Sequence, residues 1–269
     1  MSNATQSLAG TRITSLLDAN SFVEIGKSVT ARSTDFNLTE TKAPSDGVIT
    51  GYGVIDGNLV YVYSQDASVL NGTVGEMHAR KITALYDLAM KTGAPVIGLV
   101  DCAGMRLQEA TDALEAFGSI YLKQTLASGV IPQITAVFGT CGGGMAVVPA
   151  LTDFTFVEEK KGRLFVNTPN ALEGNEISKC NTASADYQSK TAGLVDGIGA
   201  EAEILGQIRD RIPLGLELTG VKRNPSRRLR PDPYSMIHII IRKSLFLNLL
   251  YRQIAGKLMN NCTNHLNMI

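Results

Sequence analysis

The segment FGTCGGGMAV at residues 138–147 joins a short apolar run to a stretch of helix-forming residues. The apolar run IPQITAVFG (131–139) has the length and composition of a buried strand, and GGGMAVVPALT (142–152) is predicted to open a helix. We call such a junction, where a predicted strand passes into a predicted helix, a crossing. A second crossing, VDCAGMR (100–106), follows the apolar run APVIGLVD (94–101) in the same way. We therefore expect two buried strands that each end in small residues at the start of a helix.

The flanking sequence continues this alternation of strands and helices. Periodic apolar residues predict helices at 75–93 and 110–129, and DFTFVEE (153–159) is predicted to form a further strand. Before them, residues 47–63 alternate β-branched with small or polar residues around an Asp-Gly pair, which is a strong hairpin signal. Strands that alternate with helices at this spacing pair in parallel through right-handed crossovers. The predicted fold class is α/β, with a mainly parallel sheet entered through a β-hairpin.

The remaining segments give weaker signals. A short helix and turn are predicted for 11–26, a turn-rich loop for 167–176, and two short helices around a Gly-Leu-Val-Asp-Gly connection for 184–212. Residues 1–212 are therefore expected to form one domain. Residues 213–269 differ in kind: they are basic, broken by proline and rich in Ile and Leu, and we expect an atypical tail with a helix. Its RRLR run has the composition of a solvated linker.

Composition excludes several classes of protein. The formal net charge is +0, so no global attraction draws the chain to nucleic acid or to an anionic membrane. The four cysteines are far apart and form no CxxC pair, which argues against a metal site or a disulfide framework and favours a reducing, cytoplasmic location. The sequence shows neither an apolar signal region nor an uninterrupted apolar stretch of membrane-spanning length, so we expect no signal peptide and no membrane span.

The two crossings expose backbone amides. The first N–H groups of a helix lack intrahelical partners and carry partial positive charge, and glycine lets a ligand oxygen approach them closely. Two such groups from neighbouring strands could stabilise the enolate of a thioester, at about 2.7–4 kcal/mol per donor. Alternatively, the glycines only permit sharp turns; a phosphate site is disfavoured because no lysine follows them. Cys102 and Cys141 lie at the two crossings. Each could act as a nucleophile or could be a small buried residue that only fills space.

Several motifs, in order, resemble the acyl-CoA carboxyltransferases over residues 11 to about 205. They are RITSLLDANSFVEI, DGVITGYGVIDG, GEMHARKI, TGAPVIGLVDCAGMRLQEATDALEAFGSI, LASGVIPQI and GTCGGGMAVVPALTDFTFV. The resemblance implies the crotonase-like (ClpP/crotonase) fold, a spiral of β-β-α units with a parallel sheet. It also implies transfer of a carboxyl group between carboxybiotin and the α-carbon of a short acyl-CoA, as in the acetyl- or propionyl-CoA carboxylases of fatty acid metabolism, or the reverse reaction of a biotin-dependent decarboxylase.

The resemblance carries the family's functional residues onto this chain. It implies that the amides of Gly143 and Gly144 hold the thioester oxygen as the catalytic pair; our hypothesis adds the amide of Gly104 or Met105 as a further donor. The residues implied to line the acyl-CoA site are Ala103, Gly104, Met105, Arg106 and Gly142. Where the family usually reads SGGAR, a glycine is replaced by Ala103 and an alanine by Met105, so the size of the substrate is expected to differ. The family's glycine- and histidine-containing stretch is replaced by SADYQSKTAGLVD, which changes the pocket there.

Four side chains near these segments could each have one of two roles. Arg106 could bind a CoA phosphate or pair with Glu109. His78 could act as a general base, although a packed histidine is more common. Asp101 and Glu109 flank the first crossing and could form an acid and base pair, although carboxylates at a helix start commonly stabilise the helix dipole instead.

Two other functions compete with the carboxyltransferase. A crotonase-type hydratase or isomerase uses the same amide pair, but it needs a carboxylate beside the glycines, where this chain has Met145, Ala146 and Val147. A truncated or frame-disrupted copy would bind acyl-CoA without turnover, a hypothesis that the atypical tail suggests. Family enzymes use a second, biotin-binding carboxyltransferase domain, with the active site between subunits. The resemblance therefore implies that domain, a biotin carboxyl carrier and a homo- or hetero-oligomer as partners.

Overall fold

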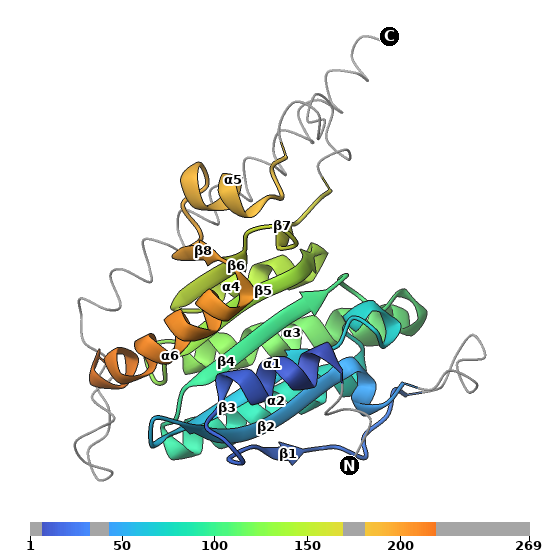
Figure 1. Cartoon of the computed structure of the whole chain (residues 1–269). Coiled ribbons are helices and arrows are strands. Elements are labelled where there is room, and N and C mark those ends of the chain that lie inside the picture. Colours follow the sequence, from blue (N-terminus) through green and yellow to red (C-terminus); the bar gives the residue numbers. More distant parts are fainter. Residues whose placement is uncertain (1–6, 33–42, 169–180, 219–269) are drawn as a thin grey trace, which may run out of the picture.

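An eight-stranded sheet runs through the part of the chain that the computed structural model describes, residues 7–32, 43–168 and 181–218 (Figure 1). Its order is β1-β2-β3-β4-β5-β6-β8, with β7 paired to β5 off this path. The strands are Val23–Ile25 (β1), Val48–Ile55 (β2), Asn58–Gln65 (β3), Val96–Cys102 (β4), Gln133–Gly142 (β5), Phe154–Glu158 (β6), Arg163–Phe165 (β7) and Gly197–Gly199 (β8). Pairing is antiparallel from β1 to β3 and parallel in every later pair, which confirms the predicted α/β class.

The β2–β3 hairpin turns at Asp56-Gly57, as the sequence predicted. Both residues have left-handed backbone, with φ of 49° and 79°, which is the conformation that a two-residue hairpin turn requires. Ile55 pairs directly with Asn58 across this turn, so the turn fixes the register of the whole hairpin. The hairpin then passes its strand β3 to the parallel part of the sheet, where Tyr63 pairs with Gly98.

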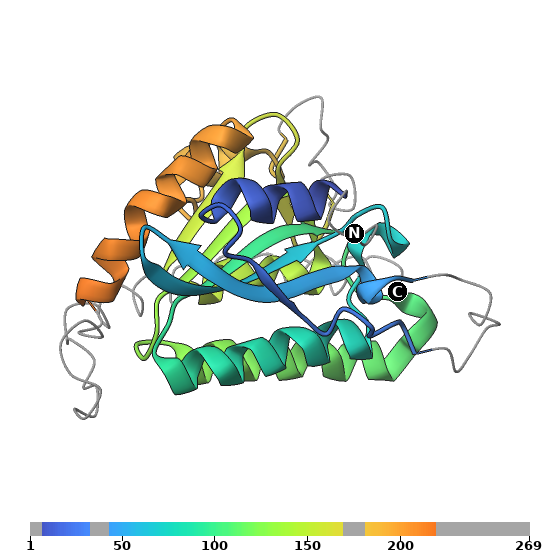
Figure 2. The same ribbon diagram turned by 60° about the horizontal axis from the view of Figure 1, so that its bottom comes forward.

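Helices cover both faces of the sheet. They are Leu8–Leu16 (α1), Glu76–Thr92 (α2), Ala110–Ala127 (α3), Val147–Leu151 (α4), Ala185–Lys190 (α5) and Glu201–Leu218 (α6). Figure 2 shows α2 and α3 side by side beneath the sheet and α1 with α6 above it. Each helical layer buries its own apolar cluster against one sheet face, because the strands of a parallel sheet are apolar on both sides.

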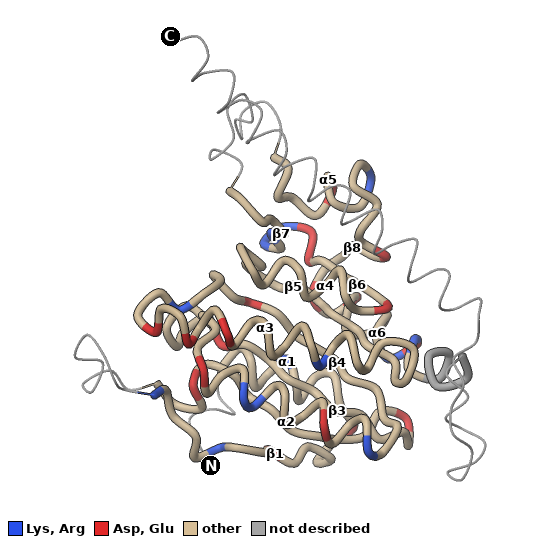
Figure 3. The backbone as a smooth tube through the Cα atoms, turned by 180° about the vertical axis from the view of Figure 1, so that it is seen from behind, with Lys and Arg blue, Asp and Glu red and all other residues tan. Residues whose placement is uncertain are grey.

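The helix ends have the expected chemistry. Gly93 follows α2 with φ of 71°, the left-handed cap that its position predicted. Ser7 precedes α1 and its hydroxyl oxygen accepts a hydrogen bond from Gly10 N at 3.3 Å, so this helix begins earlier than predicted. Among the described helices, none combines the length and the hydropathy needed to cross a bilayer. Figure 3 shows Lys and Arg positions interleaved with Asp and Glu positions along the described backbone.

Two stretches fold differently from the prediction. In place of two short helices at 184–212, the chain forms α5, then strand β8, then the long helix α6, which continues to Leu218. Strand β8 has the sequence Gly-Ile-Gly and was missed because two of its three residues have low strand propensity. The predicted helix at 142–152 begins as a 3-10 turn, Gly143–Ala146, before α4. Most of the predicted loop at 167–176, and residues 219–269, lie outside the described residues.

Two glycine-to-alanine substitutions should change stability in opposite directions. Gly118 lies in the exposed middle of α3 with no atom within 4 Å of an added Cβ, so Gly118→Ala should raise the free energy of unfolding by about 1 kcal/mol. At Gly98 an added Cβ would lie 2.2 Å from the Tyr63 hydroxyl, so Gly98→Ala should lower it by about 2 kcal/mol or more. Urea unfolding of both variants measures the two effects, and equal values for them would contradict the packing described for β3 and β4.

Candidate active site

The parallel pairing of β4 with β5 brings the two glycine segments together. The register runs from Val96 opposite Gln133 to Val100 opposite Val137, and after an irregularity it places Cys102 opposite Cys141. The loops that follow are in contact: a Cβ added to Gly104 would lie 3.2 Å from the Gly142 carbonyl oxygen. The two crossings that the sequence predicted to converge therefore lie side by side at one edge of the sheet.

The second of these loops is a turn with an open surface. Gly143 has φ of 60°, and an added Cβ there would have no atom within 4 Å. Gly143 and Gly144 are the first two residues of the 3-10 turn Gly143–Ala146. The first N–H groups of such a turn have no carbonyl partner within it. A ligand oxygen can thus approach partly positive N–H groups without meeting a side chain at Gly143.

The first loop offers a different amide from the one expected. Gly104 N donates to Cys102 Sγ at 3.3 Å, so the Gly104 amide already has an acceptor. Val74 N donates to Gly104 O, and Arg106 N donates to Val74 O, both at 2.9 Å. Because these ladder bonds use the groups on either side of Met105, the amide of Met105 points away from Val74. Of the two donors considered from the sequence, Met105 is the better candidate.

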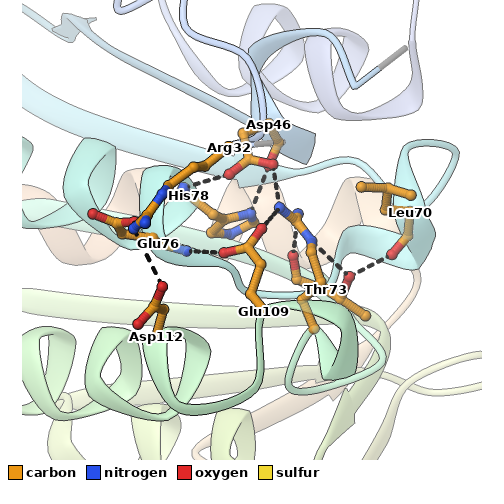
Figure 4. A network of polar contacts seen from close by, with 9 residues as sticks. Arg32, Asp46, Leu70, Thr73, Glu76, His78, Glu109 and Asp112 are labelled. Carbon is orange, nitrogen blue, oxygen red and sulfur yellow. Dashed lines mark hydrogen bonds and ion pairs between the residues drawn. The ribbon is translucent and has the colours of Figure 1, made fainter. Parts of the chain in front are cut away.

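The Arg106 side chain lies beneath this loop and is 1% exposed. Its Nη1 lies 2.5 Å from Asp46 Oδ1 and 2.8 Å from Glu109 Oε1, and its Nη2 donates to Thr73 O at 2.7 Å. Figure 4 shows Asp46, Thr73 and Glu109 surrounding the same point. Of the two roles left open for Arg106, the side chain takes the pairing with Glu109, and its burial removes it from contact with a CoA phosphate. It holds the loop in place.

Asp46 lies in an unusual turn that His78 supports. Ser45, Asp46 and Gly47 are all left-handed, with φ of 57°, 48° and 69°. His78 N donates to Asp46 Oδ2 at 2.7 Å, and His78 Nδ1 lies 2.9 Å from Asp46 O. Burial raises the pKa of Asp46, against the opposing charge of Arg106. Two charged or polar neighbours thus stabilise a backbone conformation that residues with side chains rarely adopt.

The His78 ring is a packed, neutral histidine. Its carbonyl partner Asp46 O can only accept, so Nδ1 carries the proton and Nε2 accepts from the amide of Gln65 at 3.1 Å. Burial, together with the nearby positive charge of Arg106, lowers the pKa of His78 to about 3. With no exposed surface, the ring has a structural place rather than that of a general base in contact with a ligand.

The two carboxylates beside the first crossing have partners of their own. Glu109 Oε2 accepts a hydrogen bond from Glu76 N at 2.6 Å, so it stabilises the first turn of α2 (Figure 4). The sequence had suggested a carboxylate at a helix start, but the helix is α2 rather than the α3 that follows Glu109. Asp101 Oδ1 accepts from Thr140 N at 3.2 Å, and Asp101 Oδ2 lies 3.5 Å from Arg12 Nη1. Neither carboxylate is placed as a paired acid and base.

The two cysteines are buried fillers with weak hydrogen bonds. Burial raises the pKa of Cys102 to about 12 and raises the pKa of Cys141 well above its usual value, so neither thiol ionises readily. Cys141 Sγ donates to Met145 O at 3.4 Å, and Cys102 Sγ lies 3.5 Å from Gly104 O. Each thiol therefore contacts the loop that follows it. Within the described residues, His, Cys, Asp and Glu side chains form no cluster that could hold a metal ion.

A separate cavity of about 220 Å³ lies between α2 and α3. It is lined by Arg32, Glu76, Ala79, Arg80, Thr83, Asp112, Glu115, Ala116 and Ser119. Arg32 pairs with both Glu76 and Asp112, as Figure 4 shows, so opposite charges largely balance each other in it. None of the glycine-loop residues lines this cavity.

Sequence reasoning missed several residues that build the site. Asp46 and Thr73 lie far from the crossings in sequence, and Gln65 and Tyr121 reach the site only through the folded packing. Tyr121, on α3, donates from its hydroxyl group to Gly144 O at 2.5 Å. No local pattern marks such long-range contacts, although the Ser-Asp-Gly run at 45–47 is a turn signal.

Comparison with known proteins now defines the class. The crotonase-like fold is shared with solved carboxyltransferases: the 12S transcarboxylase, solved with methylmalonyl-coenzyme A and methylmalonic acid bound, matches with a TM-score of 0.73 at 30% identity. That match covers 77% of this chain and 42% of the other. The model of the family described as "Carboxyl transferase domain" matches residues 3–206, and the chain belongs to this family.

Relatives of known activity are also similar in sequence. The propionyl-CoA carboxylase beta chain of Roseobacter denitrificans is 38% identical over 226 residues, which are 82% of this chain and 44% of the relative. The methylmalonyl-CoA decarboxylase subunit alpha of Propionigenium modestum is 41% identical over 193 residues, 71% of this chain and 37% of the relative. The chain thus spans about two fifths of the length of the relatives that it matches.

The buried His78 predicts an acid-dependent loss of stability. Its pKa is about 3 in the folded chain and 6.5 in the unfolded chain, so between these values the unfolded chain binds one more proton. The stability that the neutral ring permits is complete above pH 6.5 and is lost as the pH falls towards 3, by about 1.4 kcal/mol per pH unit.

Urea unfolding between pH 7 and pH 5 tests this slope. His78→Asn should have a lower free energy of unfolding at pH 7 than the wild type. Its free energy of unfolding should also change less with pH, by about the 1.4 kcal/mol per pH unit that one proton contributes, while the carboxylate titrations at lower pH stay common to both proteins. An identical pH dependence in the two chains would contradict the burial and neutrality of the ring.

Proposed function

We propose that residues 1–212 form the acyl-CoA-binding domain of a biotin-dependent carboxyltransferase. The observation that carries this proposal is the contact between two glycine loops at the ends of adjacent parallel strands, in a chain of the carboxyl transferase family. Acetyl- or propionyl-CoA is the substrate class that we favour, because the propionyl-CoA carboxylase chain is among the relatives. The reverse, decarboxylating direction uses the same site.

The amides of Gly143 and Gly144, with that of Met105 from the other loop, would receive the thioester carbonyl oxygen. In the decarboxylating direction the bond from the α-carbon to its carboxyl group would break, and the carboxyl group would pass to the biotin held by the partner. The electron pair of that bond would move into the thioester carbonyl, and fixed N–H dipoles would stabilise the negative charge on the oxygen without rearranging. Gly142, Ala103 and Gly104 would border the acyl and pantetheine parts. The chemistry needs backbone donors, and at Gly143 no side chain occupies the approach.

The carboxyl group would come from carboxybiotin, which a carrier protein and a second carboxyltransferase domain would hold. The described residues of this chain fit the acyl-CoA side of the reaction, and we assign none of them to biotin. An oligomer that joins this domain to the second domain would complete the active site. We place the protein in the cytoplasm, where the buried thiols of Cys102 and Cys141 stay reduced.

A hydratase or isomerase remains the weaker proposal. Such an enzyme needs a carboxylate that moves a proton at the amide pair. Among the described carboxylates beside the two loops, Asp101 is bonded to Thr140 and Arg12, and Glu109 is bonded to Arg106 and to the start of α2. Their engagement in the framework favours a reaction in which the second reactant comes from a partner.

Alanine at Gly143 tests the site directly. The added methyl group should project into the open approach and lower the affinity for propionyl-CoA by about tenfold or more, the equivalent of the 1–3 kcal/mol that an extra methyl costs in a filled space. Gly57→Ala is the matched control, because Gly57 also has left-handed backbone and no atom within 4 Å of its Cβ position but lies in the hairpin turn. Calorimetric titration with propionyl-CoA and free CoA measures both.

Carboxyl transfer is then assayed by mixing the chain with its carrier and second-domain partners and following carboxylation of propionyl-CoA. Loss of the thioester's advantage over free CoA in Gly143→Ala, with Gly57→Ala unchanged, supports the proposal. If the wild-type chain binds propionyl-CoA no more tightly than free CoA, the proposed acyl-CoA site is contradicted.

A further inference from the structure

Tyr121 links helix α3 to the glycine turn. Its hydroxyl group donates a hydrogen bond to Gly144 O at 2.5 Å, and Val147 N donates to the same carbonyl oxygen. Both lone pairs of that oxygen are thus used. The hydroxyl group is a reliable donor, because burial raises the pKa of Tyr121 and keeps it protonated.

The packing around this bond is tight on one side and open on the other. A Cβ added to Gly144 would lie 3.0 Å from Tyr121 Oη and 3.4 Å from the ring of Phe117. The two rings themselves contact each other, with centroids 5.9 Å apart. By contrast, Gly143 has left-handed backbone and open space where a side chain would be. The turn therefore has a flexible residue on its open side and an aromatic support beneath it.

We propose that Tyr121 is a positioning residue that holds the Gly144 peptide in the orientation in which its amide meets the thioester oxygen. This inference rests on the proposed function, because it assigns Tyr121 a role only if the amide pair binds a thioester. The physical reason is that two glycines restrict their own backbone angles poorly, so an external bond must fix the peptide planes. A donor stabilises developing charge only when it is aimed in advance, and a misplacement of about 1 Å can lower a rate about 100-fold.

The bond from Tyr121 is the strongest side-chain contact described for this turn. Cys141 Sγ donates to Met145 O at 3.4 Å, but a thiol is a weak donor. The amide of Gln65 lies 3.8 Å from Met145 Sδ, which is also a weak contact. Removing the Tyr121 hydroxyl group should therefore loosen the turn more than it loosens the fold.

Tyr121→Phe removes the hydroxyl group and keeps the ring in place. Tyr86→Phe is the control, since Tyr86 is a buried tyrosine on α2 and none of the hydrogen bonds described for the glycine turn involves its hydroxyl group. Both variants remove one tyrosine hydroxyl group from the layer formed by α2 and α3. Thermal unfolding establishes that each remains folded before it is compared with the wild type.

The first readout needs no ligand. Hydrogen exchange of the full chain, followed by mass spectrometry, should show faster exchange in the peptide that contains residues 138–147 for Tyr121→Phe than for the wild type or Tyr86→Phe. Equal exchange in all three proteins would overturn the positioning role without touching the proposed function.

The second readout uses propionyl-CoA labelled with ¹³C at the thioester carbonyl. In the wild type, the bound carbonyl stretch should move to lower wavenumber because the amides polarise the bond. In Tyr121→Phe we expect that shift to fall by about half while the dissociation constant changes less than about threefold, and the turnover number with partners to fall about tenfold at an unchanged KM. Tyr86→Phe should retain the full shift.

The outcomes separate the two proposals. A full carbonyl shift in Tyr121→Phe overturns the positioning role and leaves the acyl-CoA site intact. A reduced shift at unchanged affinity supports it. A wild-type chain that binds the labelled thioester without any carbonyl shift overturns the proposed function, and the role of Tyr121 with it.

Discussion

The parallel pairing of β4 with β5 is the constraint on which the site depends. Parallel strands end at the same edge of a sheet, so the two following loops must emerge together, and the register places Cys102 directly opposite Cys141. Each thiol then contacts the loop that follows it, at Gly104 and at Met145. A one-residue slip between these strands would turn alternate side chains to the other face and separate the two sets of amides.

A buried charge network fixes the first loop against the rest of the domain. Arg106 joins Asp46, in the strained turn before β2, to Glu109, which reaches the start of α2. Burying three charges costs solvation, so such a network adds less stability than its short distances suggest. Its benefit lies in geometry. The segments that contain Asp46, Arg106 and the start of α2 are distant in sequence, and the network allows them to meet in only one arrangement. The loop that contains Met105 therefore has a fixed position relative to the sheet.

Local sequence patterns predicted most of the fold, because the parallel strands are apolar runs between helices with ordinary ends. The Asp56-Gly57 turn and the Gly93 cap followed from backbone conformations that few residues adopt. Strand β8 was missed because pairing with β6, rather than its own residues, makes Gly-Ile-Gly a strand. For the site, the sequence predicted the convergence of the glycine loops, but not that Arg106 is buried between Asp46 and Glu109, since the partner Asp46 lies 60 residues away.

The proposed site, made of backbone amides, would separate binding chemistry from substrate choice. The donors at Gly143 and Gly144 depend on the turn and its support, whereas the side chains of Ala103 and Met105 can change without altering them. Met105 would combine both functions under the proposed assignment, because its amide is the donor that we propose from the first loop and its partly buried side chain packs against the core. A bulkier residue there would narrow the proposed space for the acyl group and leave the proposed carbonyl contact unchanged. On this proposal, the same backbone donors would serve acyl groups of different size within one fold.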